Sequence, residues 1–96
     1  MSLVFEVSPR TSDGVVRIKV RGDLDIGSAK EGKGAFEAIM QLHPRRIEAD
    51  LSELTFRDSV GLGVFLEAQL ALQELSIVLQ IVTASDQVRR LFDVGC

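Results

Sequence analysis

One short segment holds the residues best suited to chemistry: a serine, Ser59, that follows Asp58 and precedes Gly61 and Gly63. The segment lies between the end of an apolar run and the start of a helical pattern. A helix amino terminus offers unpaired N–H groups and roughly half a positive charge, so it would stabilise a phosphate esterified to Ser59. The two glycines would let a partner protein approach the backbone closely. The segment therefore favours a phosphorylated serine, whose phosphate would add about −1.5 to −2 charges beside Asp58.

The same residues also fit two other roles. Judged by residue type alone, Asp58 or Ser59 fits better as a simple N-cap, because such caps begin many helices. A nucleophilic serine would need a base within hydrogen-bond reach. The only histidine, His43, directly precedes Pro44 at the end of a helical pattern, where surface and capping roles are usual. The residues therefore do not predict a serine enzyme, and they leave the simple cap open.

Three further patterns that resemble functional motifs are weak. Asp23 and Asp25 follow a strand, where aspartates more often belong to a turn than to a catalytic acid–base pair. Gly61-Leu62-Gly63 lacks the third glycine of a dinucleotide fingerprint and the Lys-Ser/Thr of a P-loop. His43 and Cys96 are the only histidine and the only cysteine, which is too few for a zinc site. We therefore predict neither a metal site nor a cofactor.

Composition limits the class of protein. The chain has 96 residues with 46% hydrophobic content, enough for one compact domain. Its formal net charge of −3 and its short Arg89-Arg90 pair argue against binding to nucleic acid. No apolar run approaches the ~20 residues that a membrane-spanning helix needs. A single terminal cysteine, without a secretion leader, predicts a cytoplasmic protein whose partners are other proteins.

The elements that must position Ser59 follow from the periodicity of apolar residues. Residues 3–7 and 15–20 predict two strands that form an N-terminal hairpin. Gly22 is expected to end the second strand. Residues 29–42 predict a helix whose first turns are weakened by two glycines and which a proline stops.

The second half of the chain alternates strands and helices. Residues 47–51 predict a short buried strand, followed by a polar loop. Apolar residues recur from Ser59 to about Glu74 and predict a largely covered helix. Residues 77–82 are mostly β-branched and apolar, as expected of a central strand covered on both faces. Ser85 is well placed as the N-cap of a last helix over residues 87–92.

The predicted order of elements is β-β-α-β-α-β-α, which is typical of an α/β fold. Strands that alternate with helices after a hairpin imply right-handed crossover connections. We therefore predict a mixed, mainly parallel sheet of about four strands with helices packed against it. No repeat or linker divides the chain, so residues 1–96 are expected to form one domain.

The segment around Ser59 closely resembles the signature of the STAS domain, the family of anti-sigma factor antagonists. Asp50-Leu51-Ser52 and Asp58-Ser59-x-Gly61-Leu62-Gly63 match the family patterns after a strand and at the following helix start. Gly22-Asp23-Leu24-Asp25 is similar to the family's Gly-Glu-Leu-Asp, and Val88-Arg89-Arg90-Leu91-Phe92 to its Val-x-Arg-Leu-Phe. The matches follow the family's order across nearly the whole chain, which makes them far more specific together than singly.

The resemblance implies a protein that switches partners and is not an enzyme. It implies that Ser59 is the phosphoacceptor, that Asp58 lies beside it at the kinase contact and that Asp25 lies on a neighbouring docking loop. The residues expected to bind partners are Asp23, Asp25, Asp58, Ser59, Gly61 and Leu62. The implied partners are an anti-sigma serine kinase, which the unphosphorylated chain binds so that a sigma factor is released, and a phosphatase that resets the cycle.

Three departures from the family pattern bear on these expectations. Val60 stands where many members have a second hydroxyl residue, so phosphorylation is expected on Ser59. Ile26-Gly27-Ser28 replaces the usual Thr-Ala pair before the first helix, which would alter the docking loop. The chain ends at Cys96, where members continue with a further helix. We expect that helix to be lacking, and the apolar surface left uncovered to favour a homodimer.

Two other functions are also considered. A non-phosphorylated STAS scaffold module would keep the Ser59 surface within a stress-signalling or transporter-linked assembly. A ligand sensor would hold a nucleotide or lipid in the crevice at the strand ends. Loss of partner binding on a Ser59→Asp change would separate the switch from the scaffold, and a nucleotide that shifts the melting temperature would identify the sensor.

Overall fold

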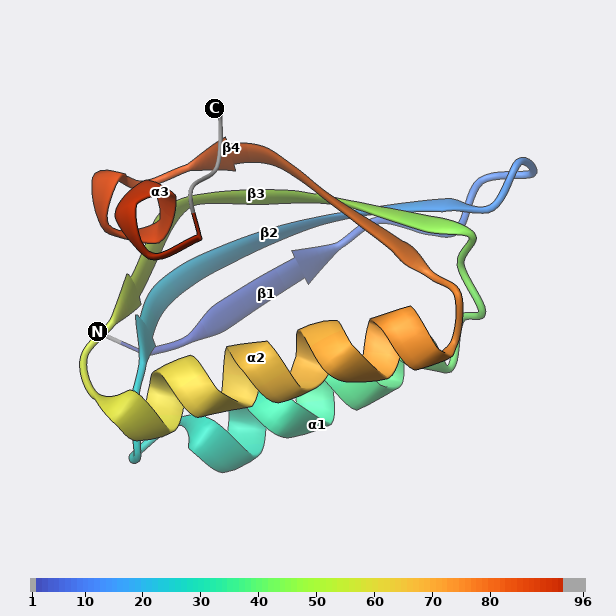
Figure 1. Cartoon of the computed structure of the whole chain (residues 1–96). Coiled ribbons are helices and arrows are strands. Elements are labelled where there is room, and N and C mark those ends of the chain that lie inside the picture. Colours follow the sequence, from blue (N-terminus) through green and yellow to red (C-terminus); the bar gives the residue numbers. More distant parts are fainter. Residues whose placement is uncertain (1, 93–96) are drawn as a thin grey trace.

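The computed structural model describes residues 2–92 and contains seven elements in the predicted order β-β-α-β-α-β-α (Figure 1). The elements are β1 (Val4–Val7), β2 (Val15–Leu24), α1 (Ala29–Met40), β3 (Arg46–Phe56), α2 (Ser59–Glu74), β4 (Val78–Ala84) and α3 (Asp86–Phe92). The predictions about the chain end at Cys96 concern residues outside those described. Within residues 2–92, no helix is both long enough and apolar enough to cross a membrane.

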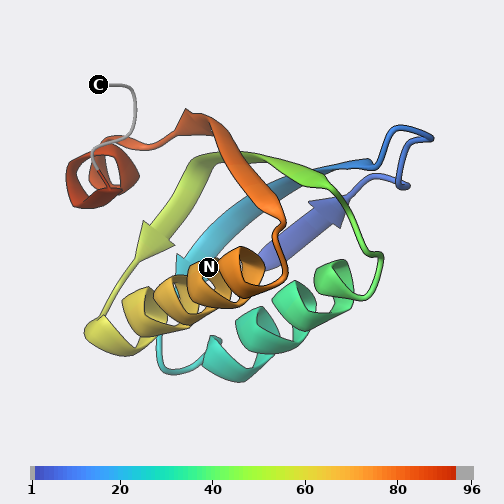
Figure 2. The same cartoon turned by 45° about the vertical axis from the view of Figure 1, so that its right-hand side comes forward.

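The four strands form one sheet in the order β1-β2-β3-β4. β1 pairs antiparallel with β2, whereas β2 with β3 and β3 with β4 pair parallel. Helices α1 and α2 lie side by side on one face of the sheet and leave its other face open (Figure 1, Figure 2). The prediction of a mixed, mainly parallel sheet is confirmed, and the carboxyl ends of β2 and β3 lead into α1 and α2 at the same end of the molecule.

The core between the sheet and these helices contains all five phenylalanines of the chain, joined by ring contacts into one cluster. Phe36 of α1 contacts Phe5 and Phe65 at ring-centroid distances of 5.2 and 5.9 Å. Phe65 of α2 also contacts Phe56 and Phe92, at 5.6 and 5.2 Å. Tilted and edge-to-face pairs of this kind each add about 0.5–1.5 kcal/mol beyond the burial of area. Phe65 is only 2% exposed and connects α2 to β3 and to α3.

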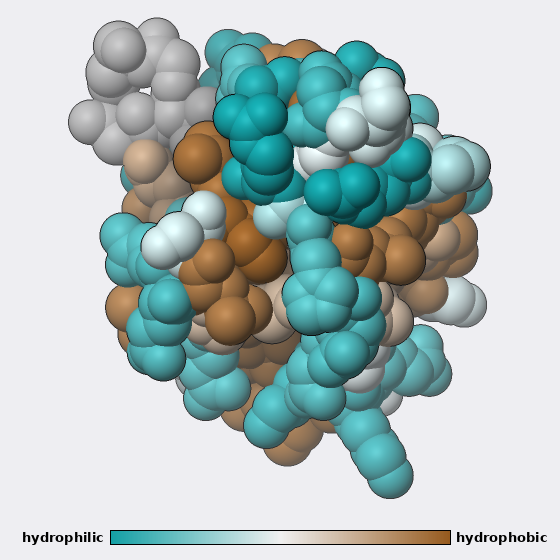
Figure 3. Space-filling view, turned by 90° about the vertical axis from the view of Figure 1, so that its right-hand side faces the viewer, coloured by the Kyte–Doolittle hydropathy of each residue, from teal (hydrophilic) through white to brown (hydrophobic). Residues whose placement is uncertain are grey.

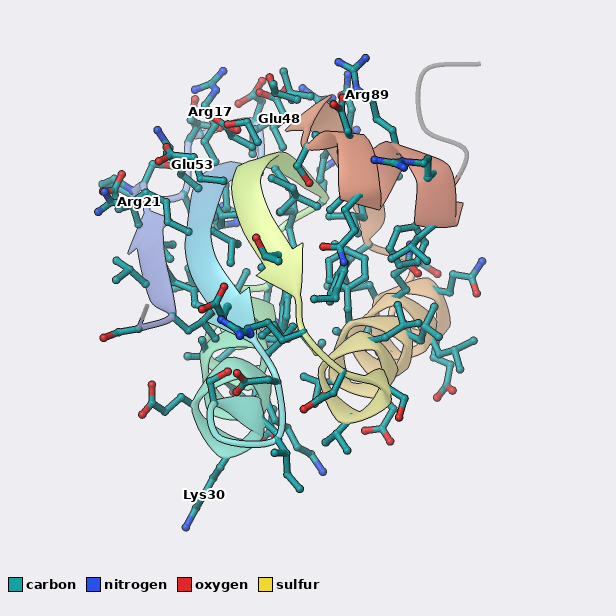
Figure 4. All side chains as sticks on the ribbon, turned by 90° about the vertical axis from the view of Figure 1, so that its left-hand side faces the viewer. Arg17, Arg21, Lys30, Glu48, Glu53 and Arg89 are labelled. Carbon is teal, nitrogen blue, oxygen red and sulfur yellow. The ribbon has the colours of Figure 1, made fainter. Side chains whose placement is uncertain are left out.

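On the open face of the sheet, the two middle strands carry ion pairs (Figure 4). Arg17 and Lys19 of β2 pair with Glu48 and Glu53 of β3, at 3.0 and 2.9 Å. These residues alternate with buried residues of the same strands, as expected for a sheet with one covered face. Since the pairs are largely solvated, each adds little stability, but together they keep this face hydrated.

Two strands extend further toward Ser59 than predicted. Gly22 does not end β2: it adopts a positive φ of 106°, and the strand continues to Leu24. Residues 53–56, predicted as part of a loop, extend β3 by pairing with the end of β2. Leu54 and Phe56 are buried there, while Glu53 and Thr55, which alternate with them, are exposed. The alternation of polar and apolar residues in this run is therefore that of a strand with one buried face, and not that of a loop.

The prediction that residues 77–82 form a central strand covered on both faces is wrong. Among residues 2–92, β4 is the outermost strand on its side of the sheet, and its Val78 and Val82 are 58% and 60% exposed. Helix α2 has the predicted bounds but is less covered than expected, because Leu66 and Leu70 are 42% and 59% exposed. Apolar composition does not by itself distinguish a buried element from one with an uncovered outer side.

Helix α1 begins at Ala29 without the predicted irregular first turns, and it ends at Met40 instead of Leu42. Gly32 is buried at a point where a Cβ atom would lie 2.9 Å from a side-chain carbon of Leu24. This glycine therefore permits close packing of α1 on the sheet, and that packing compensates for its low helix propensity.

Helix α3 completes the end of β3. As predicted, Ser85 caps the helix: its Oγ accepts a hydrogen bond from the N–H of Val88 at 3.3 Å. The side-chain amide of Gln87 accepts a hydrogen bond from the N–H of Phe56 and donates one to its C=O, both at 2.8 Å. Because β4 ends at Ala84, these side-chain bonds replace those that a neighbouring strand would make with β3.

The start of α2 packs directly on the end of β2. Gly61 is buried, and a Cβ atom there would lie 2.0 Å from the carbonyl oxygen of Leu24 and 2.8 Å from the backbone nitrogen of Asp25. A Cβ atom on Gly63, by contrast, would meet open space. Gly61 is therefore required by the packing of the chain on itself, because any side chain would push the helix away from the sheet.

We expect Gly61→Ala to destabilise the protein by about 1–3 kcal/mol, because the added methyl group would overlap the Leu24 carbonyl unless α2 shifted. Gly63→Ala is the matched control in the same turn of the helix. Its methyl group meets open space, and the higher helix propensity of alanine should stabilise the protein by up to about 1 kcal/mol. Urea unfolding followed by circular dichroism measures both changes, and equal stabilities of the two variants would contradict the described packing.

Candidate functional site

The serine predicted as a phosphoacceptor lies at the carboxyl end of the parallel strands. Ser59 is the first residue of α2, and its side chain is exposed. Figure 4 views the side of the molecule where β2 and β3 run into α1 and α2. In that view Lys30, at the start of α1, points away from α2. The surface around Ser59 is therefore built from two neighbouring connections between a strand and a helix.

Asp58, and not Ser59, is the N-cap of α2. Its Oδ1 accepts a hydrogen bond from the N–H of Gly61 at 2.8 Å. Its Oδ2 accepts one from the N–H of Ile26, in the loop between β2 and α1, at 2.9 Å. One carboxylate thus caps the helix and also attaches the neighbouring loop to it. The simple-cap explanation applies to Asp58, which leaves the hydroxyl of Ser59 at the first helical position.

These two hydrogen bonds hold the pKa of Asp58 below its usual value. The N–H of Gly61 lowers it most and that of Ile26 next, while partial burial opposes them. The Asp58 carboxylate is therefore ionised at neutral pH. Its negative charge lies at the amino end of α2, where the helix dipole favours it.

The loop between β2 and α1 is held in place by Asp25 and Ser28. The N–H of Ser28 donates to Asp25 Oδ1 and the N–H of Asp25 donates to Ser28 Oγ, both at 3.1 Å. The Ser28 hydroxyl in turn donates to the C=O of Asp23 at 2.8 Å. Within this loop Ile26 is 73% exposed, the highest value among the large hydrophobic side chains of residues 2–92. The loop therefore presents an isoleucine from a fixed backbone, close to the start of α2.

The six residues predicted to bind partners lie in three places. Asp25, Asp58 and Ser59 lie together, because the bond from Ile26 to Asp58 joins their two loops. Asp23 is directed to the open face of the sheet, where Arg57 pairs with it at 3.3 Å. The other two lie deeper: Gly61 is buried, and Leu62 is half-buried against the core.

The sequence pattern predicts no partner-binding role for Ile26 or for Arg57. The only signal for Ile26 is a large apolar residue within a run of turn-forming residues. Its importance depends on the hydrogen bond to Asp58, which joins residues far apart in the sequence. Arg57 gives no comparable signal, since a single arginine after a strand is common.

Groups for metal or acid–base chemistry are not gathered at this surface. In the part of the chain that the structure describes, no three His, Cys, Asp or Glu side chains are placed so that they could hold a metal ion. His43 follows the end of α1, whereas Ser59 lies near that helix's beginning, so the histidine is at the opposite end of the molecule.

We expect Asp58→Asn to lower stability at neutral pH and to have less effect in acid. A folded-state pKa below the unfolded value of about 3.9 means that the ionised carboxylate stabilises the fold. This stabilisation is complete above the unfolded pKa and is lost as the pH falls through the lower, folded pKa. The free energy of unfolding of the wild type and of the variant is measured by urea unfolding. It is measured once at neutral pH and once at a pH well below the unfolded pKa.

Asp86→Asn is the matched control for this change, since Asp86 also lies in the first turn of a helix but does not join two loops. It should change stability less at neutral pH than Asp58→Asn does. A difference between wild type and Asp58→Asn that is equal at both pH values would show that the charge of Asp58 is not what stabilises the site.

Comparison with known proteins agrees with the resemblance described above. Residues 7–95 match the family described as "Mlab, STAS domain". A protein of Listeria monocytogenes named anti-sigma-B factor antagonist is 32% identical over 94 residues, which cover 98% of this chain and 82% of that protein. The anti-sigma-B factor antagonist of Staphylococcus aureus is 31% identical over 90 residues, covering 94% of this chain and 83% of that protein.

Solved structures show the same fold. An anti-sigma factor antagonist from Mycobacterium paratuberculosis superposes with a TM-score of 0.75 at 26% identity, covering 97% of this chain and 77% of that chain. The phosphorylated form of the Bacillus cell fate determinant SpoIIAA superposes with a TM-score of 0.70 at 24% identity, covering 94% of this chain and 81% of that chain. From its motifs, its fold and these relatives, the chain belongs to the STAS domain family, the family of anti-sigma factor antagonists.

Proposed function

We propose that this chain acts in the cytoplasm as an anti-sigma factor antagonist that works by binding and not by catalysis. Its unphosphorylated form binds an anti-sigma serine kinase, and this releases a sigma factor. Phosphorylation of Ser59 ends the binding, and a phosphatase restores it. The observation that carries the proposal is the exposed Ser59 hydroxyl at the start of α2, where Asp58 already fills the capping role.

The proposed docking surface combines an exposed apolar side chain with acidic groups. Ile26 supplies the apolar contact, while Asp25 and Asp58 lie beside it. Asp23 borders this surface from the open face of the sheet, and Gly61 and Leu62 support it from within. Because hydrogen bonds hold both loops, a kinase would bind them without a large loss of conformational entropy.

Phosphorylation would change this surface without changing the fold. The first turn of α2 lies at the favourable end of the helix dipole, so a phosphate on Ser59 is tolerated there. It adds about −1.5 to −2 charges to a surface that also carries exposed apolar side chains, since Ile26 is 73% and Val60 is 42% exposed. Burying such a charge against an apolar surface of the kinase would cost free energy, because the phosphate would lose its hydration. The phosphorylated chain would therefore dissociate from the kinase.

The similar proteins support this proposal. Those of Listeria monocytogenes and Staphylococcus aureus are named anti-sigma-B factor antagonists. SpoIIAA has been solved in both a phosphorylated and an unphosphorylated form, and the latter is called an anti-sigma factor antagonist. Ser59, as the exposed hydroxyl at the start of α2, is the residue of this chain that we assign to such a modification.

We expect Ser59→Asp to weaken binding to the kinase by about tenfold or more, because it adds a negative charge at the centre of the docking surface. Ser59→Ala should bind as wild type does but should not be phosphorylated. Capture from a lysate of the source organism identifies the kinase by mass spectrometry. Titration calorimetry with the purified kinase then measures each affinity, and peptide mapping after incubation with ATP locates the phosphate.

Ser12→Asp is the matched control, because Ser12 is exposed in the β1–β2 hairpin at the opposite end of the molecule. This variant should bind the kinase as tightly as wild type. If Ser59→Asp also binds as tightly, the chain is a non-phosphorylated STAS scaffold module. If the wild-type chain captures no kinase at all, the antagonist proposal fails.

A further inference from the structure

Ile26, in the loop between β2 and α1, is the most exposed large hydrophobic residue of residues 2–92, at 73%. A side chain this exposed adds little to the stability of the fold, because it buries little apolar area. Single exposed apolar residues are common on protein surfaces. What distinguishes Ile26 is that its backbone is fixed and lies close to the backbone of Ser59.

Hydrogen bonds fix the backbone on both sides of Ile26. The N–H of Asp25 donates to Ser28 Oγ, and the N–H of Ser28 donates to Asp25 Oδ1, both at 3.1 Å. The N–H of Ile26 itself donates to Asp58 Oδ2 at 2.9 Å. Isoleucine is branched at Cβ, so rotation about its χ1 is already restricted. A partner that binds this side chain would therefore order few groups that the fold has not already ordered.

The bond to Asp58 places the Ile26 backbone near the proposed phosphoacceptor, because Asp58 directly precedes Ser59. The first turn of α2 also packs on this loop, since a Cβ atom on Gly61 would lie 2.8 Å from the backbone nitrogen of Asp25. A standard interface covers about 800 Å² of each partner, which is a disc of roughly 16 Å radius. A kinase centred on the Ser59 hydroxyl would therefore cover the Ile26 side chain as well.

The acidic groups of this surface already have partners within the chain. Both oxygens of Asp58 accept backbone hydrogen bonds, and Asp25 Oδ1 accepts one from Ser28. Their charges would mainly speed the approach of a basic partner and exclude wrong ones. Binding free energy comes from apolar area that leaves water. Of the two exposed large hydrophobic residues here, Ile26 is 73% exposed and Val60 is 42% exposed, so Ile26 offers more such area.

We propose that Ile26 is the specificity-determining residue of the kinase reaction: its side chain fills an apolar pocket on the kinase, next to the active site that phosphorylates Ser59. This inference rests on the proposed function and adds what the kinase must carry to recognise this chain. In the reaction, Ser59 Oγ forms a bond to the γ-phosphorus of ATP as the bond from that phosphorus to the β–γ bridging oxygen breaks. ADP leaves with this oxygen, and a base of the kinase takes the hydroxyl proton. Ile26 contributes no atom to these steps, so its effect is on binding alone.

Apolar side chains at the other end of the molecule are too far from Ser59 for this role. Figure 3 views that end, where α2 leads into β4, and shows apolar side chains gathered between polar ones. Leu75, directly after α2, is 57% exposed. Helix α2 has 16 residues, so at about 1.5 Å per residue Leu75 lies roughly 24 Å from Ser59. It is therefore outside the area that a kinase centred on Ser59 would cover.

We expect Ile26→Ala to raise the KM for phosphorylation of Ser59 by about tenfold and to leave kcat unchanged. The reason is that it removes binding that the substrate complex and the transition state share equally. Ile26→Leu nearly keeps the volume of the side chain and should restore most of the affinity. The kinase is the one that the wild-type chain captures, and initial rates with radiolabelled ATP give both constants.

Leu75→Ala is the matched control, because it also shortens an exposed apolar side chain, and it should leave KM and kcat as in the wild type. Both alanine variants should keep the wild-type Tm, which shows that a change in KM does not come from unfolding. Equal KM values for Ile26→Ala and the wild type would overturn the inference, and the proposed function would stand if Ser59→Asp still lost the kinase. A lower kcat with an unchanged KM would also overturn it. A wild-type chain that binds no kinase would instead remove the proposed function itself.

Methyl NMR of the wild-type chain tests the pocket without any variant. On addition of the kinase the methyl signals of Ile26 should shift, whereas those of the buried Ile39 and Ile47 should stay in place. Ile26 signals that do not move while the kinase binds would overturn the inference, even if the alanine variant did not fold.

Discussion

The Asp58 carboxylate accepts hydrogen bonds from two parts of the chain, Gly61 in α2 and Ile26 in the loop after β2, and the candidate site depends on this sharing. The bonds form because α2 begins close against β2, an approach that Gly61 allows where any Cβ atom would meet the Leu24 carbonyl at 2.0 Å. A helix start and a loop from another strand are thereby held as one surface. The backbone positions of Ser59 and Ile26 are therefore fixed relative to each other.

This arrangement separates the chemistry of Ser59 from the stability of the fold. Capping is provided by Asp58, and packing is provided by Gly61 and by the phenylalanine cluster around Phe65. Ser59 itself is exposed at the first helical position. A modification there changes charge and shape on the surface while the contacts that hold α2 stay in place, which is what a reversible switch requires.

The rest of the sheet divides into surfaces of different character. The middle of the open face carries ion pairs between β2 and β3, and the short β1 strand carries the paired Glu6. β4 and the adjoining side of α2 are mostly apolar and uncharged. The end that carries Ser59 and this apolar side use different parts of α2, its first turn and its later turns. One helix therefore serves a modifiable surface and an apolar one without conflict between them.

The sequence by itself determined the order of elements, the bounds of α2, the Ser85 cap and the STAS motif around Ser59, because these depend on local periodicity, capping and short-range pattern. Only the tertiary structure decided that β2 continues past Gly22, that residues 53–56 extend β3 and that Val78 and Val82 of β4 are exposed. It also decided that Asp58 is the cap and that the backbone of Ile26 is bonded to it. Each of these depends on which distant strand or loop lies alongside, and a local apolar pattern carries no information about its neighbours in space.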